Sequence, residues 1–481
     1  MTGNKVIKAG VGYTVGNYLL KGLSFLTIPI FARILSTEDY GIVNTFGSYE
    51  SILFVIIGLA IHSSFKNARY KYGTLEEGAK QGSDYGTYVS NAYLFIIINA
   101  LIWFTLAFFF RFKLAELLKI EPSLVLLLVI NSSANAIVVA FNSDTSIRYE
   151  YGRFLGISFF NAITNIVVSI LLIRYVFPEN KYIGRIIGTV VPIVLAGGFV
   201  AFMQIRRSKP NQVVSMIKWG LKYSIPIVPH GISQIILSSF DRIMITRMVS
   251  AAASGVYSFA YNVFVIVSVT ATSIDTVWNP WFYERRRQDD YEAIRKYSSI
   301  YTLFLAFFCF MVMLLSPEII RILGGTKYND SIYCVIPIVA GGFFTMLYNI
   351  PATVEYYHEK TGKIATATIT AAVMNILLNY VFIRKYGYVA AAYTTLATYF
   401  LYYCFHYFMS VKIERKSLFS QKIILLSAFM VLSGSAFSIL LMKHFLIRLM
   451  IALIFMSGFI ILEEKELALL KKLKKRLKKG Q

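Results

Sequence analysis

Apolar windows long enough to cross a bilayer recur along the whole chain, and this pattern constrains the fold more than any other feature. A membrane-spanning helix needs about 20 mostly apolar residues. Because the apolar runs are continuous and do not alternate, they predict helices and exclude barrel strands. Only 15% of the 481 residues are charged, whereas a soluble domain has about a quarter. About fourteen windows occur, at residues 10–35, 40–64, 88–110, 120–142, 154–177, 184–205, 219–246, 255–279, 297–320, 332–357, 364–384, 389–411, 422–442 and 447–462.

Positive charge is distributed unevenly between the connections of these windows. With fourteen crossings both termini lie on one side, and the connections on that side hold about two thirds of the 48 lysines and arginines. The positive-inside rule therefore predicts cytoplasmic termini. The first window is too long for a signal-peptide core, so we expect an uncleaved anchor. The net charge of +23 lies largely in short loops and in the tail "LKKLKKRLKKG", which favours anionic lipid over nucleic acid as a partner.

One short phrase occurs twice in the chain. "RILSTEDYGIV" begins at Arg33 and "RMVSAAASGVY" begins at Arg247, 214 residues later. Further along the offset becomes 210, where Gly152 and Asn165 match Gly362 and Asn375. Windows one to six therefore repeat as seven to twelve in the same orientation. We expect Gly41 and Gly255 in the two phrases to permit a close turn or a helix entry on the extracytoplasmic side.

The repeat predicts an all-α polytopic membrane protein of two parallel six-helix lobes with two extra C-terminal helices. The expected parts are an N-terminal lobe at 1–210, a C-terminal lobe at 211–416, helices thirteen and fourteen at 417–464 and a basic cytoplasmic tail at 465–481. Two repeats meeting at an axis normal to the membrane are a usual way to build a central transport pathway. Cys309, Cys334 and Cys404 fall in apolar windows without metal-ligand spacing, so we expect core residues and no metal or other cofactor.

Three stretches resemble a known family. They are "FLTIPIFARILSTEDYGIVNTF", "YSIPIVPHGISQIILSSFDRIMITRMVSAAASGVYSFAY" and "VWNPWFYERRR". Together they resemble the polysaccharide biosynthesis, or Wzx-type, flippases of the multidrug/oligosaccharidyl-lipid/polysaccharide exporter superfamily. The resemblance implies a MATE-like fold and a flippase that moves undecaprenyl-diphosphate-linked repeat units of capsule, O-antigen or a related polymer across the bacterial cytoplasmic membrane. It also implies a polysaccharide polymerase and glycosyltransferases as partners in the same pathway.

Ionisable residues inside the windows are the first functional candidates, because such groups are costly in a membrane unless they are paired or line water. Lys21 lies near the middle of the first window and Glu50 near the middle of the second. The two either form a structural ion pair or leave Lys21 free to attract a diphosphate in the cavity. The family's habit of lining its cavity with cations favours the second reading.

Further candidates lie nearer the ends of the windows. Arg242 follows Asp241 in the outer third of window seven, where a guanidinium could meet a diphosphate. Asp241 and Arg242 could equally contact neighbouring helices. At the cytoplasmic ends, Arg148 and Arg153 are candidate phosphate contacts. Asp275 and Glu355 there, and Glu50 and Asp241 within the windows, are candidate gate or ion-coupling groups.

Window seven contains the motif "SIPIVPHGIS", which predicts a kink. Pro226 and Pro229 each remove a helix donor and Gly231 loosens the next turn. His230 at this break is either a protonation-linked switch or a simple buried hydrogen-bonding group. We expect this segment to act as a hinge between the lobes.

Other functions are compatible with parts of the pattern. No Gly-rich phosphate loop, metal spacing or pair of loop carboxylates is found, so an enzyme is not expected. A multidrug or cation antiporter of the same fold would need unpaired carboxylates at mid-membrane, and a lipid II flippase is a further alternative. A membrane-embedded glycan polymerase would need a large extracytoplasmic loop, whereas the outer loops here span about ten residues.

Overall fold

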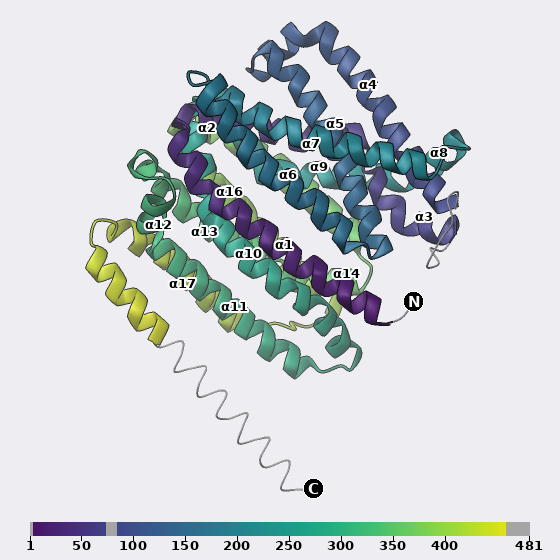
Figure 1. Cartoon of the computed structure of the whole chain (residues 1–481). Coiled ribbons are helices and arrows are strands. Elements are labelled where there is room, and N and C mark those ends of the chain that lie inside the picture. The colour runs from purple at the N-terminus through teal and green to yellow at the C-terminus, as the bar shows by residue number, and fades with distance from the viewer. Residues whose placement is uncertain (1–2, 74–83, 458–481) are drawn as a thin grey trace. The chain divides into compact units, whose positions relative to one another are not determined.

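The structure is a computed structural model that describes residues 3–73 and 84–457. Every regular element in these two ranges is helical (Figure 1). The α-helices are α1 (Gly3–Ile34), α2 (Thr37–Gly58), α3 (Phe65–Lys71), α4 (Asp84–Leu118), α5 (Pro122–Arg148), α6 (Tyr151–Leu171), α7 (Lys181–Arg207), α8 (Val213–Ser224), α9 (Val228–Met248), α10 (Ala251–Arg287), α11 (Tyr291–Leu314), α12 (Ser316–Leu323), α13 (Ile332–Leu347), α14 (Asn349–Tyr357), α15 (Thr361–Tyr386), α16 (Val389–Glu414) and α17 (Gln421–Leu440). Shorter 3₁₀ or π turns are η1 (Ile61–Ser64), η2 (Leu172–Val176), η3 (Ile225–Ile227) and η4 (Thr326–Ser331).

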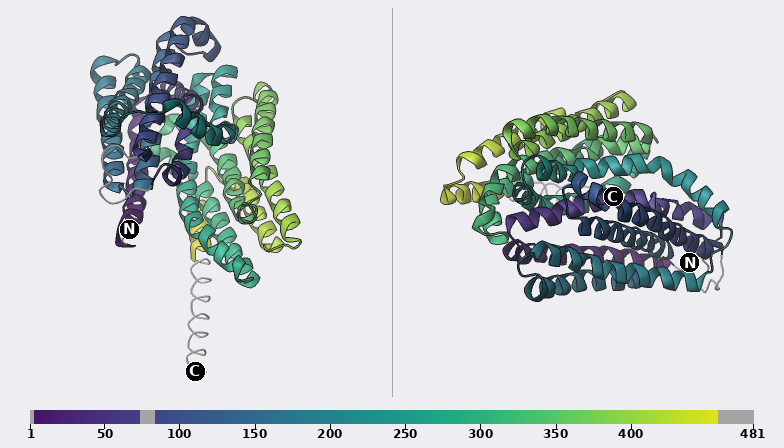
Figure 2. Two further views of the ribbon diagram at one scale, coloured as in Figure 1. Left: turned by 90° about the vertical axis from the view of Figure 1, so that its right-hand side faces the viewer. Right: turned by 90° about the horizontal axis from the view of Figure 1, so that it is seen from above.

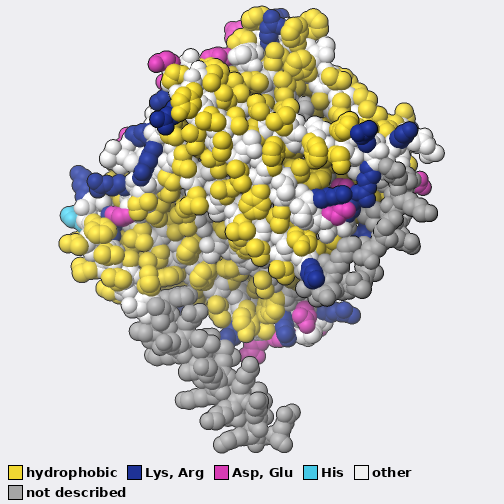
Figure 3. All heavy atoms as spheres, in the orientation of Figure 1, with side chains coloured by type: hydrophobic (Ala, Val, Ile, Leu, Met, Phe, Trp, Pro, Cys, Tyr) yellow, Lys and Arg dark blue, Asp and Glu magenta, His cyan; other side chains and the backbone are white. Residues whose placement is uncertain are grey.

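Eleven helices within the described ranges are long and apolar enough to cross a membrane. They match the expected crossings one to six, eight to eleven and thirteen. The seventh expected crossing corresponds to α8, η3 and α9, the twelfth to α16, and the fourteenth to the shorter apolar helix Phe445–Ser457. Exposed apolar side chains such as Phe109 and Phe429 cover these helices, and Figure 3 shows how densely such side chains populate one face. The all-helical membrane fold predicted from the sequence is confirmed.

The chain divides into two compact units, which are described separately. The first contains Met1–Asn262 and Thr361–Thr398, and the second contains Val263–Lys360 and Tyr399–Gln481. In the first unit, α6 packs against α1 and α7 (Figures 1 and 2). In the same unit α9 packs against α2 and α15. In the second, α11 packs against α13 and α17. This division differs from the lobe boundary at 210 and 211, which follows from the repeat and stays a prediction.

The repeated phrase forms the same structure twice at the starts of α2 and α10. We call the helix ends that the sequence assigns to the cytoplasm the inner ends, and the opposite ends the outer ends. Ser36 Oγ accepts a hydrogen bond from the backbone N–H of Asp39 at 3.0 Å. Ser250 Oγ accepts one from the N–H of Ala253 at 3.1 Å. Each serine thus accepts a hydrogen bond from a backbone N–H that has no partner within the helix. Both copies of the repeated phrase therefore contain a helix N-cap.

The two glycines of the phrase lie inside the helices, where α2 and α10 cross. A methyl group on Gly41 would lie 1.8 Å from the carbonyl oxygen of Ala251. One on Gly255 would lie 1.8 Å from the carbonyl oxygen of Thr37. Of the two expected roles, the turn does not apply, because the turns precede the serine caps and both glycines lie just inside the helix starts. Because glycine has no side chain, Gly41 and Gly255 allow the backbones of α2 and α10 to approach closely.

The repeat is also visible in the backbone at the inner ends of α5 and α14. Tyr149 and Glu359 follow these helices with φ angles of 59° and 57°, in the left-handed region. The N–H of Glu150 donates to Thr145 at 2.9 Å, and the N–H of Lys360 donates to Glu355 at 2.8 Å. Both helices therefore end in the same way.

Candidate functional site

Lys21 lies in the middle of α1 with its side chain exposed. It makes no hydrogen bond or ion pair with the described part of the chain. Glu50 on α2 accepts a hydrogen bond from Asn135 Nδ2 at 2.6 Å and does not contact Lys21. The ion pair that the sequence left open is therefore absent, and Lys21 keeps an uncompensated charge.

Arg242 occupies the outer third of α9 without a carboxylate partner. Its guanidinium lies 4.4 Å from the ring centroid of Tyr261, and Nη1 donates to the carbonyl oxygen of Ser238 at 2.9 Å. Nε is buried without a hydrogen-bond partner. Asp241, the adjacent residue, hydrogen-bonds other side chains, so Arg242 retains hydrogen-bonding capacity.

Arg185 on α7 is a second guanidinium near the outer end. Nη1 donates to Asn165 Oδ1 at 2.5 Å and to Ser169 Oγ at 2.8 Å, and the group lies 3.9 Å from the ring centroid of Phe31. All these partners are neutral. The Tyr40 hydroxyl, which accepts from Asn262, lies close enough to feel the charge of both Arg185 and Arg242.

Sequence reasoning did not single out Arg185, because it lies close to a connection and resembles a loop charge. A usable signal was present: Arg185 is followed by an apolar run, and Asn165 and Ser169 stand four residues apart on the preceding helix. Polar residues at that spacing share one helix face. Asn165 and Ser169 can therefore both accept hydrogen bonds from one guanidinium that lies on the next helix.

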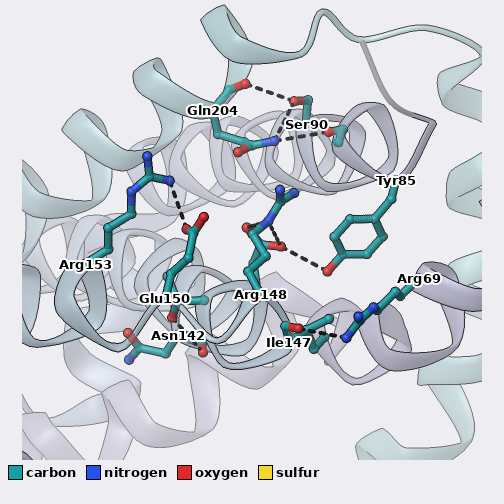
Figure 4. Close-up of polar contacts among 12 residues, drawn as sticks. Arg69, Tyr85, Ser90, Asn142, Ile147, Arg148, Glu150, Arg153 and Gln204 are labelled. Carbon is teal, nitrogen blue, oxygen red and sulfur yellow. Dashed lines mark hydrogen bonds and ion pairs between the residues drawn. The ribbon is translucent and has the colours of Figure 1, made fainter. Parts of the chain in front are cut away.

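Arg148 lies buried at the inner end of α5, as Figure 4 shows. Nε donates to both oxygens of Asp144 at 2.8 Å, and the Tyr85 hydroxyl donates to Asp144 Oδ1 at 2.9 Å. One nitrogen, Nη2, is buried without a partner. The pair is within a single helix, so it is not a gate between lobes. Arg148 is less available to a phosphate than the sequence led us to expect.

Arg153 lies beside this cluster and is more exposed (Figure 4). Nη1 donates to Glu150 Oε2 at 2.9 Å, with 58% of the Arg153 side chain exposed. Arg69 donates to the carbonyl oxygen of Ile147 at 2.9 Å. An incoming anion could therefore displace the Glu150 contact of Arg153 at little cost.

Asp241 is 1% exposed and bonds only neutral donors. Oδ1 accepts from Asn379 at 2.6 Å, while Oδ2 accepts from Tyr257 at 2.6 Å and Thr395 at 3.0 Å. These donors tie α9 to α10, α15 and α16. Both carboxylate oxygens are thus satisfied.

Two other carboxylates predicted as gate or coupling groups lie in the second unit. Asp275 on α10 accepts from Tyr301 at 2.8 Å and from Asn349 at 2.6 Å. Glu355 on α14 lies 2.5 Å from His406 Nδ1 on α16, and both side chains are 0% exposed. The sequence did not single out His406, because a lone histidine in an apolar window is usually a core residue.

The expected irregularity in the seventh crossing is present. The chain passes from α8 through the 3₁₀ turn η3, which contains Pro226, into α9, which begins just before Pro229. Gly231 lines a cavity of about 250 Å³ beside this break. His230 Nδ1 is buried without a hydrogen-bond partner. Hinge motion at this segment stays a prediction.

A charged clamp lies at the inner ends of α10 and α16. Arg286 donates to Glu414 at 2.8 and 3.0 Å, and His358 Nε2 lies 2.9 Å from the same carboxylate. In the following turn, hydrogen bonding from Tyr291 and the nearby Arg286 guanidinium hold the pKa of Asp289 below its usual value.

No group of three histidine, cysteine or acidic side chains suited to a metal ion occurs in residues 3–73 and 84–457. Cys309 and Cys334 are buried as free thiols, and Cys404 is half-buried. Among the described residues of the first unit, Lys21, Arg185 and Arg242 form no ion pair with a carboxylate, whereas Arg148 and Arg153 do.

Comparison with known proteins gives relatives that span most of the chain. A protein of the Lsg locus of Haemophilus influenzae is 21% identical over 385 residues, covering 77% of this chain and 90% of the relative. The Haloferax volcanii protein named "Probable low-salt glycan biosynthesis flippase Agl15" is 20% identical over 394 residues, covering 81% and 80%.

Solved structures share the fold at low identity. A lipid II flippase MurJ in an inward closed conformation superposes with a TM-score of 0.72 and 18% identity, covering 95% of this chain and 99% of that one. An inward-facing MATE transporter of the MOP superfamily has a TM-score of 0.62 and 14% identity, covering 85% and 98%. The family model described as "Polysaccharide biosynthesis protein" matches residues 7–285. Since that match covers more than half of its residues, the chain belongs to the polysaccharide biosynthesis protein family, on a fold shared with MurJ and MATE transporters.

Proposed function

We propose that this chain is a flippase that moves polyprenyl-diphosphate-linked glycan units across the cytoplasmic membrane of a bacterium by alternating access. Family membership supports a role in polysaccharide biosynthesis. The Haloferax relative is named a probable glycan biosynthesis flippase and MurJ a lipid II flippase, and these names of similar proteins support a lipid-linked substrate here. The polyprenyl tail stays in lipid while the headgroup crosses through water.

One observation carries the proposal: three cations within the described membrane helices form no ion pair and hydrogen-bond only neutral groups or none. Lys21, Arg185 and Arg242 make no ion pair with a carboxylate in the described ranges. Such groups are costly in a membrane unless they line water or await an anion. A diphosphate is the anionic part of the substrate, and guanidinium groups match its oxygens.

The cations are distributed along the direction of transport. Arg153 lies at an inner end, Lys21 in the middle of its helix, and Arg185 and Arg242 towards outer ends. A substrate that passed from one to the next would never lose all of its electrostatic compensation. We include Arg148 only as a support for this path, because Asp144 already holds its guanidinium.

The crossing of α2 and α10 fits alternating access. Thr45 on α2 hydrogen-bonds Ser254 on α10 at 3.4 Å, and it also hydrogen-bonds Thr246 on α9 at 2.6 Å. Direct backbone packing leaves no room for a hydrated headgroup, so release at the outer end requires these two helices to separate. Both termini are proposed to be cytoplasmic, and a polymerase and glycosyltransferases are proposed partners in the same pathway.

The test is export of surface polymer from a strain that lacks its own copy of this gene. Lys21→Ala and Arg242→Ala should each abolish or strongly reduce export, whereas Lys21→Arg should retain part of it. Membrane abundance of each variant, measured by immunoblot, controls for folding. Normal polymer from a stably inserted Lys21→Ala, Arg242→Ala protein would overturn the proposal.

A cation antiporter is the second candidate, because two membrane carboxylates lack a cationic partner. Glu50 accepts from Asn135 alone, and Asp241 is bonded only by neutral groups. The two candidates differ in the charge they need. Resistance to cationic compounds that is lost in Glu50→Gln but kept in Lys21→Ala would favour the antiporter.

A further inference from the structure

A buried pair of titratable side chains joins the tenth and twelfth crossings near their inner ends, and the proposed function does not use it. Glu355 and His406 are both 0% exposed, and Glu355 Oε1 lies 2.5 Å from His406 Nδ1. The second oxygen, Glu355 Oε2, and the second ring nitrogen, His406 Nε2, are buried with no hydrogen-bond partner. Orphaned polar atoms of this kind are uncommon in folded proteins and call for an explanation.

The other buried carboxylates differ from Glu355 in what they bond. Asp241 has both oxygens occupied by neutral donors. Asp144 is paired with Arg148, whose charge is permanent. Glu355 is instead paired with an imidazole, which can hold a proton on either ring nitrogen. The pair is therefore a place where a proton can be gained or lost.

The proton count of this pair decides its net charge. With one shared proton, the pair is either an ionised Glu355 with a protonated His406 or two neutral groups, and in both cases it is neutral overall. Loss of that proton to water leaves one negative charge without compensation. Burying such a charge is strongly unfavourable, so the packed state retains the proton.

Neighbouring groups do not replace the missing partner. The rings of Tyr348 and Tyr402 lie 5.2 and 4.5 Å from the His406 ring centroid. Two other carboxylates of the second unit are bonded elsewhere: Asp275 to Tyr301 and Asn349, and Glu414 to Arg286 and His358. Exchange of the proton therefore requires water to reach the pair.

The helix that carries Glu355 is a short, separate segment. α14 has nine residues and is separated from α13 at Tyr348, the residue whose ring contacts His406. At its other end, Glu359 has a φ of 57° and reverses the chain. A displacement of α14 would expose Glu355 Oε2 and His406 Nε2 to water, which would satisfy both orphaned atoms.

We propose that Glu355 and His406 form a proton-binding site that exchanges one proton with water when α14 moves away from α16. The proton passes from water to the pair and returns to water, and no bond other than those to hydrogen changes. Because the packed state holds the proton, proton binding is coupled to the conformational cycle. The coupling to transport rests on the proposed flippase function, whereas the proton site itself does not.

The proton site is tested by infrared difference spectra of the protein in liposomes, recorded between about pH 5 and 8, where histidine titrates. The wild-type protein should show a pH-dependent carboxyl band that Glu355→Gln removes and His406→Asn displaces. Glu414→Gln is the matched control, since Glu414 also contacts a histidine but is held by Arg286. Its spectrum should keep the band.

A wild-type spectrum without any pH-dependent carboxyl or imidazole change overturns the site, even if the variants fail to fold. A band that survives in Glu355→Gln also overturns it. The five histidines of the chain allow a second measurement on wild-type protein, by NMR of labelled imidazoles. One of the five should respond to pH in step with the carboxyl band.

Coupling is tested by export, or by flipping of an undecaprenyl-diphosphate glycan in liposomes, with and without a pH gradient. Coupled sites typically change each other's equilibria by about 5- to 150-fold, so we expect Glu355→Gln to reduce stimulation by the gradient about tenfold. Stimulation equal to that of the wild type would overturn coupling. If no glycan is flipped by the wild type, the proposed function fails while the infrared result still decides the proton site.

Discussion

Two places in the first unit occupy equivalent positions in the repeat but carry opposite charge. In the first half, Asn165 accepts from Arg185 at 2.5 Å, between the fifth and sixth crossings. In the second, Asn375 donates to Thr395 at 3.3 Å, between the eleventh and twelfth crossings. Each residue of the second pair lies 210 positions after its counterpart. The helix contact is thus retained, although the cation has become a neutral hydroxyl.

The second place gains a carboxylate where the first has none. Asp241 accepts from Thr395, Tyr257 and Asn379, whereas Arg185 has only neutral partners. The packing of the helix pairs depends on polar residues at fixed spacing, and it tolerates a positive charge at one place and a negative charge at the other. The charged groups at the two places therefore differ, although the polar contacts between the helices are retained.

Removing the Asp241 carboxylate should produce the largest effect. Asp241→Ala leaves the buried donors of Tyr257, Asn379 and Thr395 without their acceptor, and each unsatisfied group costs about 1–3 kcal/mol. We expect a loss of at least about 3 kcal/mol in the free energy of unfolding. Asp241→Asn retains the shape and one acceptor, so it should lose about 1–3 kcal/mol. Thermal unfolding in detergent measures both, and equal losses would show that packing, not hydrogen bonding, holds this centre.

Substitution of the two glycines where α2 and α10 cross tests whether the two halves are equivalent at this contact. Gly41→Ala and Gly255→Ala each place a methyl 1.8 Å from a carbonyl oxygen. Overpacking of this kind costs about 1–3 kcal/mol, and it should favour conformations in which α2 and α10 are apart. Cysteine accessibility at Thr246 from the outer side, in a background without Cys309, Cys334 and Cys404, measures this change.

The control for the crossing is Gly47→Ala, because nothing lies within 4 Å of a methyl at Gly47 on the same helix. It should leave accessibility unchanged and stabilise the helix slightly. Strongly unequal effects of Gly41→Ala and Gly255→Ala would show that the halves are not equivalent even here.

The sequence predicted the helical membrane fold, the repeat and the break at Pro226 because each leaves a local pattern. Apolar length, spacing and missing donors can be read along the chain. Contacts between distant helices leave no such pattern. Nothing around Lys21 or Glu50 indicated that Asn135 would bond Glu50 and leave Lys21 without a partner.

The same limit applies to the groups that sequence reasoning missed. Arg185 resembled a loop charge and His406 a core histidine, and each acquires its meaning from a partner on another helix. The serine caps of α2 and α10 were present in the repeated phrase, but the use of its glycines depends on the crossing. Such roles follow from tertiary packing.

Replacing Arg185 separates the electrostatic role of this residue from its structural role. Arg185→Met keeps an apolar stem against Phe31 but removes donors to Asn165 and Ser169, which should cost about 1 kcal/mol. Export should fall much more than this change in stability explains, since a cation beside Tyr40 is lost. Arg185→Lys should restore part of it, and full export from Arg185→Met would remove this residue from the anion path.

Arg153 should show the smallest effect on stability and yet reveal whether the inner end contributes to binding. Its partner Glu150 is on the same helix turn, and with 58% of the Arg153 side chain exposed the pair is a surface salt bridge. Such pairs contribute about 0–1 kcal/mol, so the unfolding temperature of Arg153→Ala should stay close to that of the wild type.

If Arg153 meets the diphosphate before Lys21 does, export by Arg153→Ala should fall and the dependence of export on salt should weaken, because one screened charge has been removed. Glu150→Gln is the matched control: it breaks the same pair but leaves the cation, so it should keep or increase export. Equal export in all three proteins would restrict the anion path to Lys21, Arg185 and Arg242.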